Sequence, residues 1–350
     1  MNAIFKADIQ DILANPISWE KLRNKVVMIT GASGMVGSYL VHTLLALNEQ
    51  DYNVKVVGVM RNPKKMDEAV LNNPNFEVYV HDVSLPFNYE GTVDYIIHAA
   101  SPASPLIMKD KPVETAAANA LGTYYSLLLA KEKQAAGYMF ISSREIYGQP
   151  LNNEEFFYED TYGFVNPLDP RSCYPEGKKF AETLCASFAA EYGLNAKSAR
   201  LAHTYGPGMS IYDGRVQADF LNNVIHGEDI VLKSEGLPVR TYTYIADAIA
   251  GMFYVLLDGE EMAYNIGDEN AKISIRGLAE LLVELTTDKE LKLVFDIPEG
   301  GTKGTAPFTA GILNSGKLRG LGWAPKQTLE TGFKRMIDYL KLEMEAGNIK

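Results

Sequence analysis

A tyrosine and a lysine four residues apart are the strongest candidates for acid–base chemistry in this 350-residue sequence. Tyr174 and Lys178 stand at the expected start of a helix, where a spacing of four places both side chains on one face. Pro175 suits the first turn of that helix and leaves Tyr174 at its mouth. A phenol has a pKa of about 10, so it needs a nearby cation to act as a base near neutral pH. We therefore predict that Tyr174 is a catalytic base and that Lys178 supports it.

A serine is expected close to this pair. Ser143 follows a predicted strand at residues 138–141, and ligands of parallel sheets gather at the carboxyl ends of strands. Its hydroxyl can bond the substrate oxygen that Tyr174 deprotonates. Each feature alone has a plain structural explanation, since Ser143 can cap a strand end and Lys178 can be a solvated helix lysine. The ordered combination of the three residues is more specific than any one of them.

Three glycines separate the first predicted strand, residues 26–29, from an apolar pattern of helical spacing. The first glycine of such a turn permits a tight bend, the second lets the backbone approach a pyrophosphate, and the third lets helix and strand pack closely. The N-terminus of the helix then offers free N–H groups to the phosphates. We therefore predict a dinucleotide-binding turn formed by Gly31, Ser33, Gly34, Met35, Val36 and Gly37.

The kind of dinucleotide is less sharply specified. An NAD site usually has an acidic residue at the end of the second strand, about 20 residues after the turn, to bond the ribose hydroxyls. Arg61 occupies that place here, where it can pair with the 2′-phosphate of NADP, lie on the adenine or point to solvent. Asp82 and Val83 follow the third predicted strand and either contact the adenine or form a turn. We predict NAD, and Arg61 leaves NADP open.

The elements that must position these residues alternate between strand and helix. Strands are predicted at residues 26–29, 54–60, 76–80, 93–98 and 138–141, with helical patterns between them, which indicates a Rossmann-type doubly wound parallel α/β sheet. A smaller α/β C-terminal lobe would hold the substrate. The expected division is an N-terminal extension with a docking helix (1–24), a dinucleotide-binding domain (25–202 and about 241–262) and the substrate lobe (203–240 and 263–350).

Composition excludes several classes of protein. The 33 basic and 44 acidic side chains give a net charge of −11, which opposes general binding to nucleic acid. No apolar run reaches the roughly 18 residues of a membrane-spanning helix, and the first 23 residues carry too many charges for a signal peptide. Two cysteines, Cys173 and Cys185, form neither a disulfide framework nor a zinc site on their own. We expect a cytoplasmic protein with no metal and no membrane partner.

Several longer segments resemble one enzyme family. The chain is similar to extended short-chain dehydrogenases/reductases of the nucleotide-sugar epimerase/dehydratase kind, and most of all to the UDP-glucuronate decarboxylase (UDP-xylose synthase) group. Similarity spans roughly residues 25–340, and the Ser-Pro-Ala-Ser-Pro stretch is its most group-specific part. The matching segments are residues 98–105, 119–123, 143–148, 171–184, 204–207, 213–216, 240–247, 264–267 and 321–323.

The resemblance implies a role for each matching residue. Ser143 orients the sugar 4-hydroxyl, Tyr174 is the base with Lys178 as its partner, and Glu145 is the acidic residue near C5 and C6 of the sugar. Further cofactor contacts are implied for Ala99, Ala100, Ser101 and Asn119. The resemblance also implies a UDP-linked nucleotide sugar as substrate, with contacts from Ser104, Arg144, His203, Arg215 and Arg240.

The implied reaction begins with oxidation of the sugar at C4. A carboxylate at C6 would then lie β to a carbonyl and could leave as CO₂, with the protein supplying position and charge and the nicotinamide the redox step. The substrate stays open because the chain departs from the group: Arg144 replaces a small hydroxyl residue, His203 an Asn and Gly208 an Arg. Residues 304–308 also differ from the usual Arg-rich segment. A cation at position 144 cannot donate the proton of a 4,6-dehydration.

Three alternatives remain. A 4-epimerase or a 4-keto-sugar reductase would use the same fold, whereas a non-catalytic dinucleotide-binding protein would need only the glycine turn. Two long helical patterns, at residues 113–134 and 175–192, either form the seam of a homodimer or pack only against the sheet.

Overall fold

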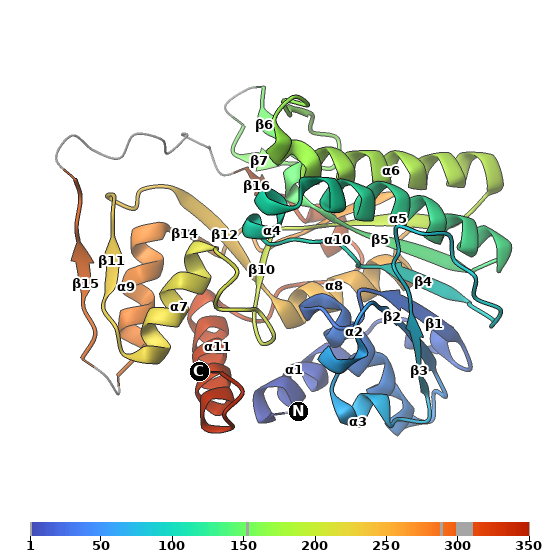
Figure 1. Ribbon diagram of the computed structural model, residues 1–350, viewed down its shortest axis with the longest axis horizontal. Coiled ribbons are helices and arrows are strands. Elements are labelled where there is room, and N and C mark those ends of the chain that lie inside the picture. Colours follow the sequence, from blue (N-terminus) through green and yellow to red (C-terminus); the bar gives the residue numbers. More distant parts are fainter. Residues whose placement is uncertain (1, 152–153, 288–289, 299–310, 350) are drawn as a thin grey trace.

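A seven-stranded parallel sheet forms the centre of the protein (Figure 1), whose computed structural model describes residues 2–151, 154–287, 290–298 and 311–349. The strand order β13-β9-β5-β4-β1-β2-β3 reverses between β1 and β4, so the Rossmann-type doubly wound fold is confirmed. The strands are β1 (Val26–Thr30), β2 (Lys55–Met60), β3 (Phe76–Val80), β4 (Tyr95–His98), β5 (Gly137–Ser143), β9 (Ala196–Leu201) and β13 (Ala263–Ile266).

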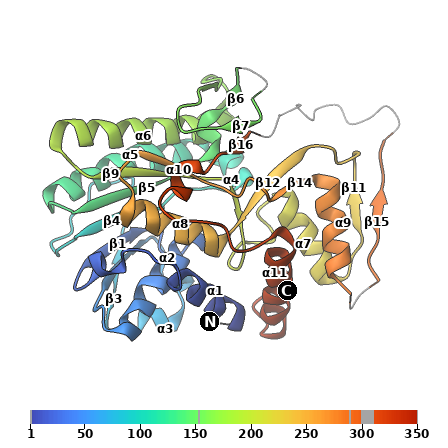
Figure 2. The ribbon, with the colours of Figure 1, turned by 180° about the vertical axis from the view of Figure 1, so that it is seen from behind.

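Helices cover both faces of the sheet. On one face α5 and α6 pack against each other and against β4, β5 and β9, and on the other face α2 and α8 pack against the sheet, with α1 outside them (Figures 1 and 2). None of the described helices is long and apolar enough to cross a bilayer. The helices of this part are α1 (Ala3–Leu13), α2 (Met35–Ala46), α3 (Glu68–Leu71), α4 (Pro105–Asp110), α5 (Pro112–Glu132), α6 (Cys173–Tyr192), α8 (Ile245–Asp258) and α10 (Gly316–Arg319).

The second lobe holds a small sheet and three helices. Strand β12 pairs in parallel with β10 and antiparallel with β14, while β11 and β15 form a separate parallel pair. Because β12 runs directly into α8, which packs on the main sheet, the two lobes are joined there. The elements are β10 (His203–Tyr205), α7 (Val216–His226), β11 (Ile230–Leu232), β12 (Val239–Tyr244), β14 (Lys272–Ser274), α9 (Ile275–Leu285), β15 (Leu293–Phe295) and α11 (Leu329–Glu345).

Short elements complete the description. Two small strand pairs, β6 with β8 and β7 with β16, lie near the start of α6 at the top of the view in Figure 1. Their bounds are β6 (Gln149–Pro150), β7 (Phe156–Phe157), β8 (Gly163–Phe164) and β16 (Ile312–Leu313). The 3₁₀ helices are η1 (Trp19–Leu22), η2 (Leu47–Gln50), η3 (Pro63–Lys65), η4 (Arg144–Tyr147) and η5 (Pro170–Ser172).

The boundary that we predicted at residue 263 runs through the large sheet. Strand β13 pairs in parallel with β9, from Ala263 opposite Ser198 to Ile266 opposite Leu201. A strand this short, following a helix and with no long apolar run, carries no local signal that separates it from the lobe. The chain therefore crosses between the two lobes again after β13.

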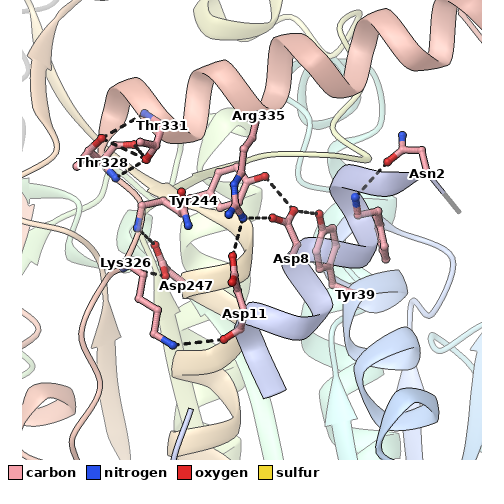
Figure 3. Close-up of polar contacts among 12 residues, drawn as sticks. Asn2, Asp8, Asp11, Tyr39, Tyr244, Asp247, Lys326, Thr328, Thr331 and Arg335 are labelled. Carbon is pink, nitrogen blue, oxygen red and sulfur yellow. Dashed lines mark hydrogen bonds and ion pairs between the residues drawn. The ribbon is translucent and has the colours of Figure 1, made fainter. Parts of the chain in front are cut away.

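The N-terminal helix α1 joins the two lobes through a buried carboxylate (Figure 3). Asp8 is fully buried and accepts hydrogen bonds from the hydroxyls of Tyr39 on α2, at 2.7 Å, and Tyr244 at the end of β12, at 2.9 Å. Its other oxygen accepts from Arg335 on α11, which also donates to Asp11. We call these five residues the α1 clamp. The amphipathic docking helix expected here is present, and Phe5, Ile9 and Ile12 are buried beside the clamp.

Candidate active site

A cleft of about 580 Å³ opens between the carboxyl ends of the sheet strands and the second lobe. It lies at the switch point between β1 and β4, where doubly wound sheets bind their ligands. Most of the predicted site residues meet there: Gly31, Gly34, Met35, Val36, Gly37, Ala99, Ser101, Ser104, Ser143, Arg144, Glu145, Tyr174, Lys178, His203, Arg215 and Arg240 all line the cleft.

The glycine turn forms one wall of the cleft, and two of its positions require glycine. Gly31 has a φ of +70°, and a Cβ there would lie 2.8 Å from the Cα of Ala100. A Cβ on Gly37 would lie 2.1 Å from the carbonyl oxygen of Gly31, so only glycine lets α2 pack this closely on the turn. The N-terminus of α2 thus opens on the cleft through Gly34 and Met35, a geometry that fits the pyrophosphate of a dinucleotide.

Several buried polar atoms in the cleft wall have no hydrogen-bond partner within the described part of the chain. A buried polar group without a partner costs on the order of 1–3 kcal/mol, so such atoms mark where a polar ligand would bind. They come from the ends of β4 and β5 and from the second lobe. The atoms are Ser101 Oγ, Ser142 Oγ, His203 Nδ1, Gln217 Nε2 and the hydroxyl of Tyr242.

Tyr174, Ser143 and Lys178 come together at the floor of the cleft. Burial and, to a smaller extent, the charge of Glu145 raise the pKa of the Tyr174 phenol to about 12, although a hydrogen bond with Ser143 partly opposes them. The Lys178 ammonium lies 5.5 Å from the centre of the Tyr174 ring and donates to the carbonyl of Ile141 at 2.6 Å. Burial lowers the pKa of Lys178 to about 7. The phenol is therefore protonated in the free protein, and added positive charge would be needed to make it a base.

Ser143 also fixes the residues that follow β5. It is the last residue of the strand, and its Oγ caps η4 by accepting from the backbone N–H of Glu145 at 3.2 Å. The Glu145 carboxylate forms an ion pair with Arg171, 2.9 Å away. Sequence reasoning did not find Arg171 as this partner, because 26 residues and an irregular loop separate the two. The pair holds the carboxylate in one direction at the edge of the cleft.

Four basic side chains surround the other end of the cleft. Arg144 donates to the carbonyl of Gly311 at 3.3 Å and Arg240 to that of Val239 at 2.8 Å, and neither forms an ion pair within the described residues. Burial lowers the pKa of Arg144, and burial together with the charges of Arg144, Arg240 and Arg215 holds the pKa of His203 well below its ordinary value. An anion is the ligand that this concentration of positive charge would stabilise.

Some predicted cofactor residues lie outside the cleft wall. Asp82 accepts from the backbone N–H of Ser84 at 2.9 Å and so takes part in a turn, and Val83 is buried in an apolar cluster. Ala100 donates its N–H to Thr30, and the amide of the buried Asn119 donates to the carbonyl of Thr115 at 2.8 Å. The structure places Ser33 within the glycine turn and Arg61 on the surface after β2, whereas residues 304–308 fall outside the described residues.

Sequence reasoning also missed residues from the second lobe that line the cleft. Tyr242 and Gln217 both end in unpartnered atoms there. A signal for Tyr242 existed, because it belongs to the segment 240–247 that resembles the nucleotide-sugar enzymes, and Gln217 follows the similar segment 213–216. Other wall residues that received no role from the sequence, from both lobes, are Ala103, Pro105, Ile141, Leu201, Ala202, Thr204, Met209, Ser210, Asp213 and Val216.

Comparison with known proteins identifies the family of the chain. The model of the NAD dependent epimerase/dehydratase family matches residues 27–267. The chain belongs to this family. Members are enzymes that use NAD, and the glycine turn, the α2 N-terminus and the unpartnered Ser101 hydroxyl are where this chain would hold such a dinucleotide.

Curated relatives within the family are UDP-glucuronic acid decarboxylases. UDP-glucuronic acid decarboxylase 6 of Arabidopsis thaliana is 33% identical over 322 residues, which cover 92% of this chain and 90% of that protein. UDP-glucuronic acid decarboxylase 1 of Xenopus tropicalis is 32% identical over 323 residues, 92% of this chain and 73% of that protein. The resemblance seen in the sequence is thus confirmed.

Solved structures share the fold. UDP-glucose 4-epimerase of Thermotoga maritima superposes with a TM-score of 0.74 at 24% identity, covering 91% of this chain and 99% of that one. An epimerase of Methanothermobacter thermautotrophicus gives a TM-score of 0.78 at 19% identity, covering 97% and 96%. At these identities the likeness shows the Rossmann-like fold alone.

Proposed function

We propose that this protein oxidises C4 of a UDP-linked uronic acid and releases CO₂ from C6, the reaction named for its curated relatives. The observation that carries the proposal is the meeting of Ser143, Tyr174 and Lys178 with a cationic pocket in one cleft. The triad supplies acid–base chemistry at a sugar hydroxyl, and the arginines supply a place for a carboxylate and a diphosphate. A chain that only binds a dinucleotide would need neither.

Ser143 and Tyr174 act on the 4-hydroxyl of the sugar. Their shared hydrogen bond places two oxygens where one substrate hydroxyl can bond both, and Tyr174 then takes the hydroxyl proton. Lys178 stabilises the phenolate with its buried charge. When bound, NAD supplies the redox chemistry, because its nicotinamide takes up the hydrogen and two electrons that leave C4 and later returns them.

The cationic pocket and Glu145 act on the C5–C6 side. Once C4 is a carbonyl, a C6 carboxylate is part of a β-keto acid, so CO₂ can leave while the electron pair moves onto the C4 oxygen. We assign Arg240 to the carboxylate, Arg215 to the nucleotide end, and Glu145, fixed by Arg171, to the side where C5 regains a proton. Ser104 and His203 complete the substrate wall.

A second outcome, 4-epimerisation with the carboxylate kept, is favoured by Arg144. Loss of CO₂ moves negative charge away from C6, so a guanidinium bound to the carboxylate stabilises the reactant more than the transition state. Arg144 is half-buried near Arg240 and forms no ion pair with an acidic side chain among the described residues. It would therefore slow the loss of CO₂ relative to return of the hydrogen at C4.

The products of UDP-glucuronate distinguish these outcomes. We expect CO₂ and a UDP-pentose, with some 4-epimer, and we expect Arg144→Ser to raise the pentose fraction. Mass spectrometry and NMR of the quenched reaction give both fractions. UDP-glucose serves as the uncharged comparison. Turnover of UDP-glucose in preference to UDP-glucuronate would contradict the uronic acid assignment, and steady consumption of added reduced cofactor would indicate a 4-keto-sugar reductase instead.

We further propose that the active form is a homodimer joined through α5 and α6. Leu121, Tyr124 and Phe180 are large apolar side chains that stay 40–51% exposed on these adjacent helices. Sedimentation should give twice the mass of one chain, and Leu121→Glu together with Phe180→Glu should give a monomer. A wild-type monomer at micromolar concentration would contradict the proposal. Both cysteines are free thiols, which suits the cytoplasm that we propose as its location.

A further inference from the structure

The end of β2 lies directly beside the glycine turn. The backbone N–H groups of Gly31 and Ala32 both donate to the carbonyl of Val59, at 2.9 and 3.3 Å, and Thr30 is the register partner of Val59. Arg61 follows two residues later, as the first residue after the strand. In this fold the adenosine ribose of the dinucleotide lies next to the end of the second strand. The residues after Met60 therefore lie near the place where the ribose hydroxyls would bind.

Three cations occupy this position. Arg61, Lys64 and Lys65 are all exposed, and none of them forms an ion pair within the described residues. Asn62 holds the segment in one conformation, because its side chain caps η3 by accepting from the backbone N–H of Lys64 at 3.1 Å. A fixed patch of three positive charges stands out in a chain whose net charge is −11.

The carboxylates nearest to this patch along β2 and β3 already cap backbone N–H groups within the described residues. No acidic residue occurs from Arg61 to Met66, and the Asp67 carboxylate caps α3 through the backbone N–H of Ala69 at 2.9 Å. Asp82, at the end of the neighbouring β3, is engaged with Ser84. A pair of neutral hydroxyls would thus gain little from the three cations, whereas a phosphate can accept hydrogen bonds from all of them.

We propose that Arg61, Lys64 and Lys65 form a binding site for the 2′-phosphate of the adenosine ribose, so that this chain prefers NADP to NAD. A phosphate monoester carries a charge of about −1.5 to −2 at pH 7, which the patch can neutralise. The guanidinium of Arg61 can bind two phosphate oxygens at once, and the two lysines add point charges beside it. The nicotinamide end is the same in both dinucleotides, so the chemistry proposed at Tyr174 is unaffected.

The test isolates the 2′-phosphate. Adenosine 2′,5′-bisphosphate and adenosine 5′-monophosphate differ only in that group, and their binding to the full-length wild-type protein is measured by calorimetric titration and by thermal shift. We expect the bisphosphate to bind at least about tenfold more tightly, since one charge-assisted hydrogen bond contributes that much. The difference should shrink as salt rises. Equal affinities, or tighter binding of the monophosphate, would overturn the proposal.

Substitutions at Arg61 test whether the preference for the 2′-phosphate depends on this residue. Arg61→Ala should lower affinity for the bisphosphate about tenfold and leave the monophosphate unchanged, and Arg61→Asp should reverse the preference. Lys292→Asp makes the same kind of charge change next to β15, at the opposite side of the molecule from β2 in Figure 1, and should leave both affinities unchanged. An affinity ratio that survives Arg61→Ala would refute the site. Both measurements report binding and need no turnover. They therefore test the 2′-phosphate site even if the proposed reaction is wrong.

Discussion

The α1 clamp and the active-site cleft both bury charge, and they do so in opposite ways. In the clamp, Asp8 accepts from two tyrosine hydroxyls and from Arg335, so every oxygen of the buried carboxylate has a donor (Figure 3). In the cleft, Arg144 and Arg240 are bonded only to backbone carbonyls within the described residues. His203 Nδ1 and the Tyr242 hydroxyl have no partner there at all.

Buried polar groups that are fully paired stabilise the fold, whereas those left unpaired are available to bind a ligand. A fully paired network offsets part of the cost of burying its charges, although burial still raises the pKa of Asp8, and it positions α1, α2, β12 and α11 relative to one another. An unpaired set of buried groups lowers the stability of the fold and regains that free energy only when an anion or a polar ligand binds. The clamp is therefore expected to govern stability, and the cleft is expected to govern binding and turnover.

The largest expected effect is on turnover alone. Tyr174→Phe removes the proposed base, so kcat should fall by about 10²- to 10⁴-fold while the thermal unfolding midpoint stays close to that of the wild type. Tyr192→Phe, which changes a partly exposed tyrosine at the end of the same helix, is the matched control and should be fully active. If kcat of Tyr174→Phe equals that of the wild type, the cleft residues do not govern turnover as proposed.

Substitutions in the α1 clamp should lower the free energy of unfolding. Asp8→Ala leaves the Tyr39 and Tyr244 hydroxyls buried without their acceptor and takes one anion from Arg335, so it should cost about 3–5 kcal/mol of unfolding free energy, as measured by urea titration. Asp11→Ala removes the more exposed partner of the same arginine and should cost about 1 kcal/mol or less. Equal losses for the two variants would show that Asp8 is not the centre of the clamp.

Removing a cation from the cleft should have the opposite effect to Asp8→Ala. Arg240→Met deletes a half-buried charge that has no acidic partner within the described residues, so the free energy of unfolding should stay the same or rise by about 1 kcal/mol. Affinity for UDP-glucuronate should nevertheless fall at least about tenfold in a binding titration, because a charge-assisted contact is lost. A destabilisation as large as that of Asp8→Ala would mean that the cleft, too, is a structural network.

His98 combines both features: one ring nitrogen is hydrogen-bonded to the Thr30 hydroxyl at 2.7 Å, and the other has no hydrogen-bond partner in the described part of the chain. Burial lowers its pKa to about 3, so on acidification the unfolded chain takes up a proton at this residue that the folded chain refuses. Stability should therefore fall as the pH drops below about 6.5, by about 2 kcal/mol at pH 5. His98→Gln should flatten that part of the pH profile in chemical unfolding. If the unfolding free energy of His98→Gln falls with pH as steeply as that of the wild type, His98 is not the group responsible.

Local patterns predicted the parts of the molecule that depend on neighbours in sequence. The glycine turn, the end of β5 at Ser143 and the spacing of Tyr174 and Lys178 each lie within one βα unit, where strand and helix periods are readable. The Asp8–Arg335 contact joins residues 327 positions apart, and no periodicity encodes such a pairing. The same holds for β13, a four-residue strand whose place is set by its pairing with β9.

The directions in which side chains point could not be predicted from the sequence either. Asp82 stands at a strand end, as an adenine-binding acid would, yet its carboxylate bonds its own turn. Arg171 belongs to a segment whose resemblance was recognised, but its ion pair with Glu145 depends on how the loop before α6 folds back. These outcomes are decided by competition among nearby hydrogen-bond donors, which only the folded chain presents together.

The central claim is that Tyr174 promotes oxidation of the sugar at C4. Single-turnover mixing with UDP-glucuronate, followed by rapid quenching into borodeuteride, traps any 4-keto sugar as a hexuronate or pentose with deuterium at C4. Wild-type protein should give this label at early times, and Tyr174→Phe should give almost none. Turnover of the wild-type protein without deuterium at C4, or equal labelling with the variant, would contradict the account.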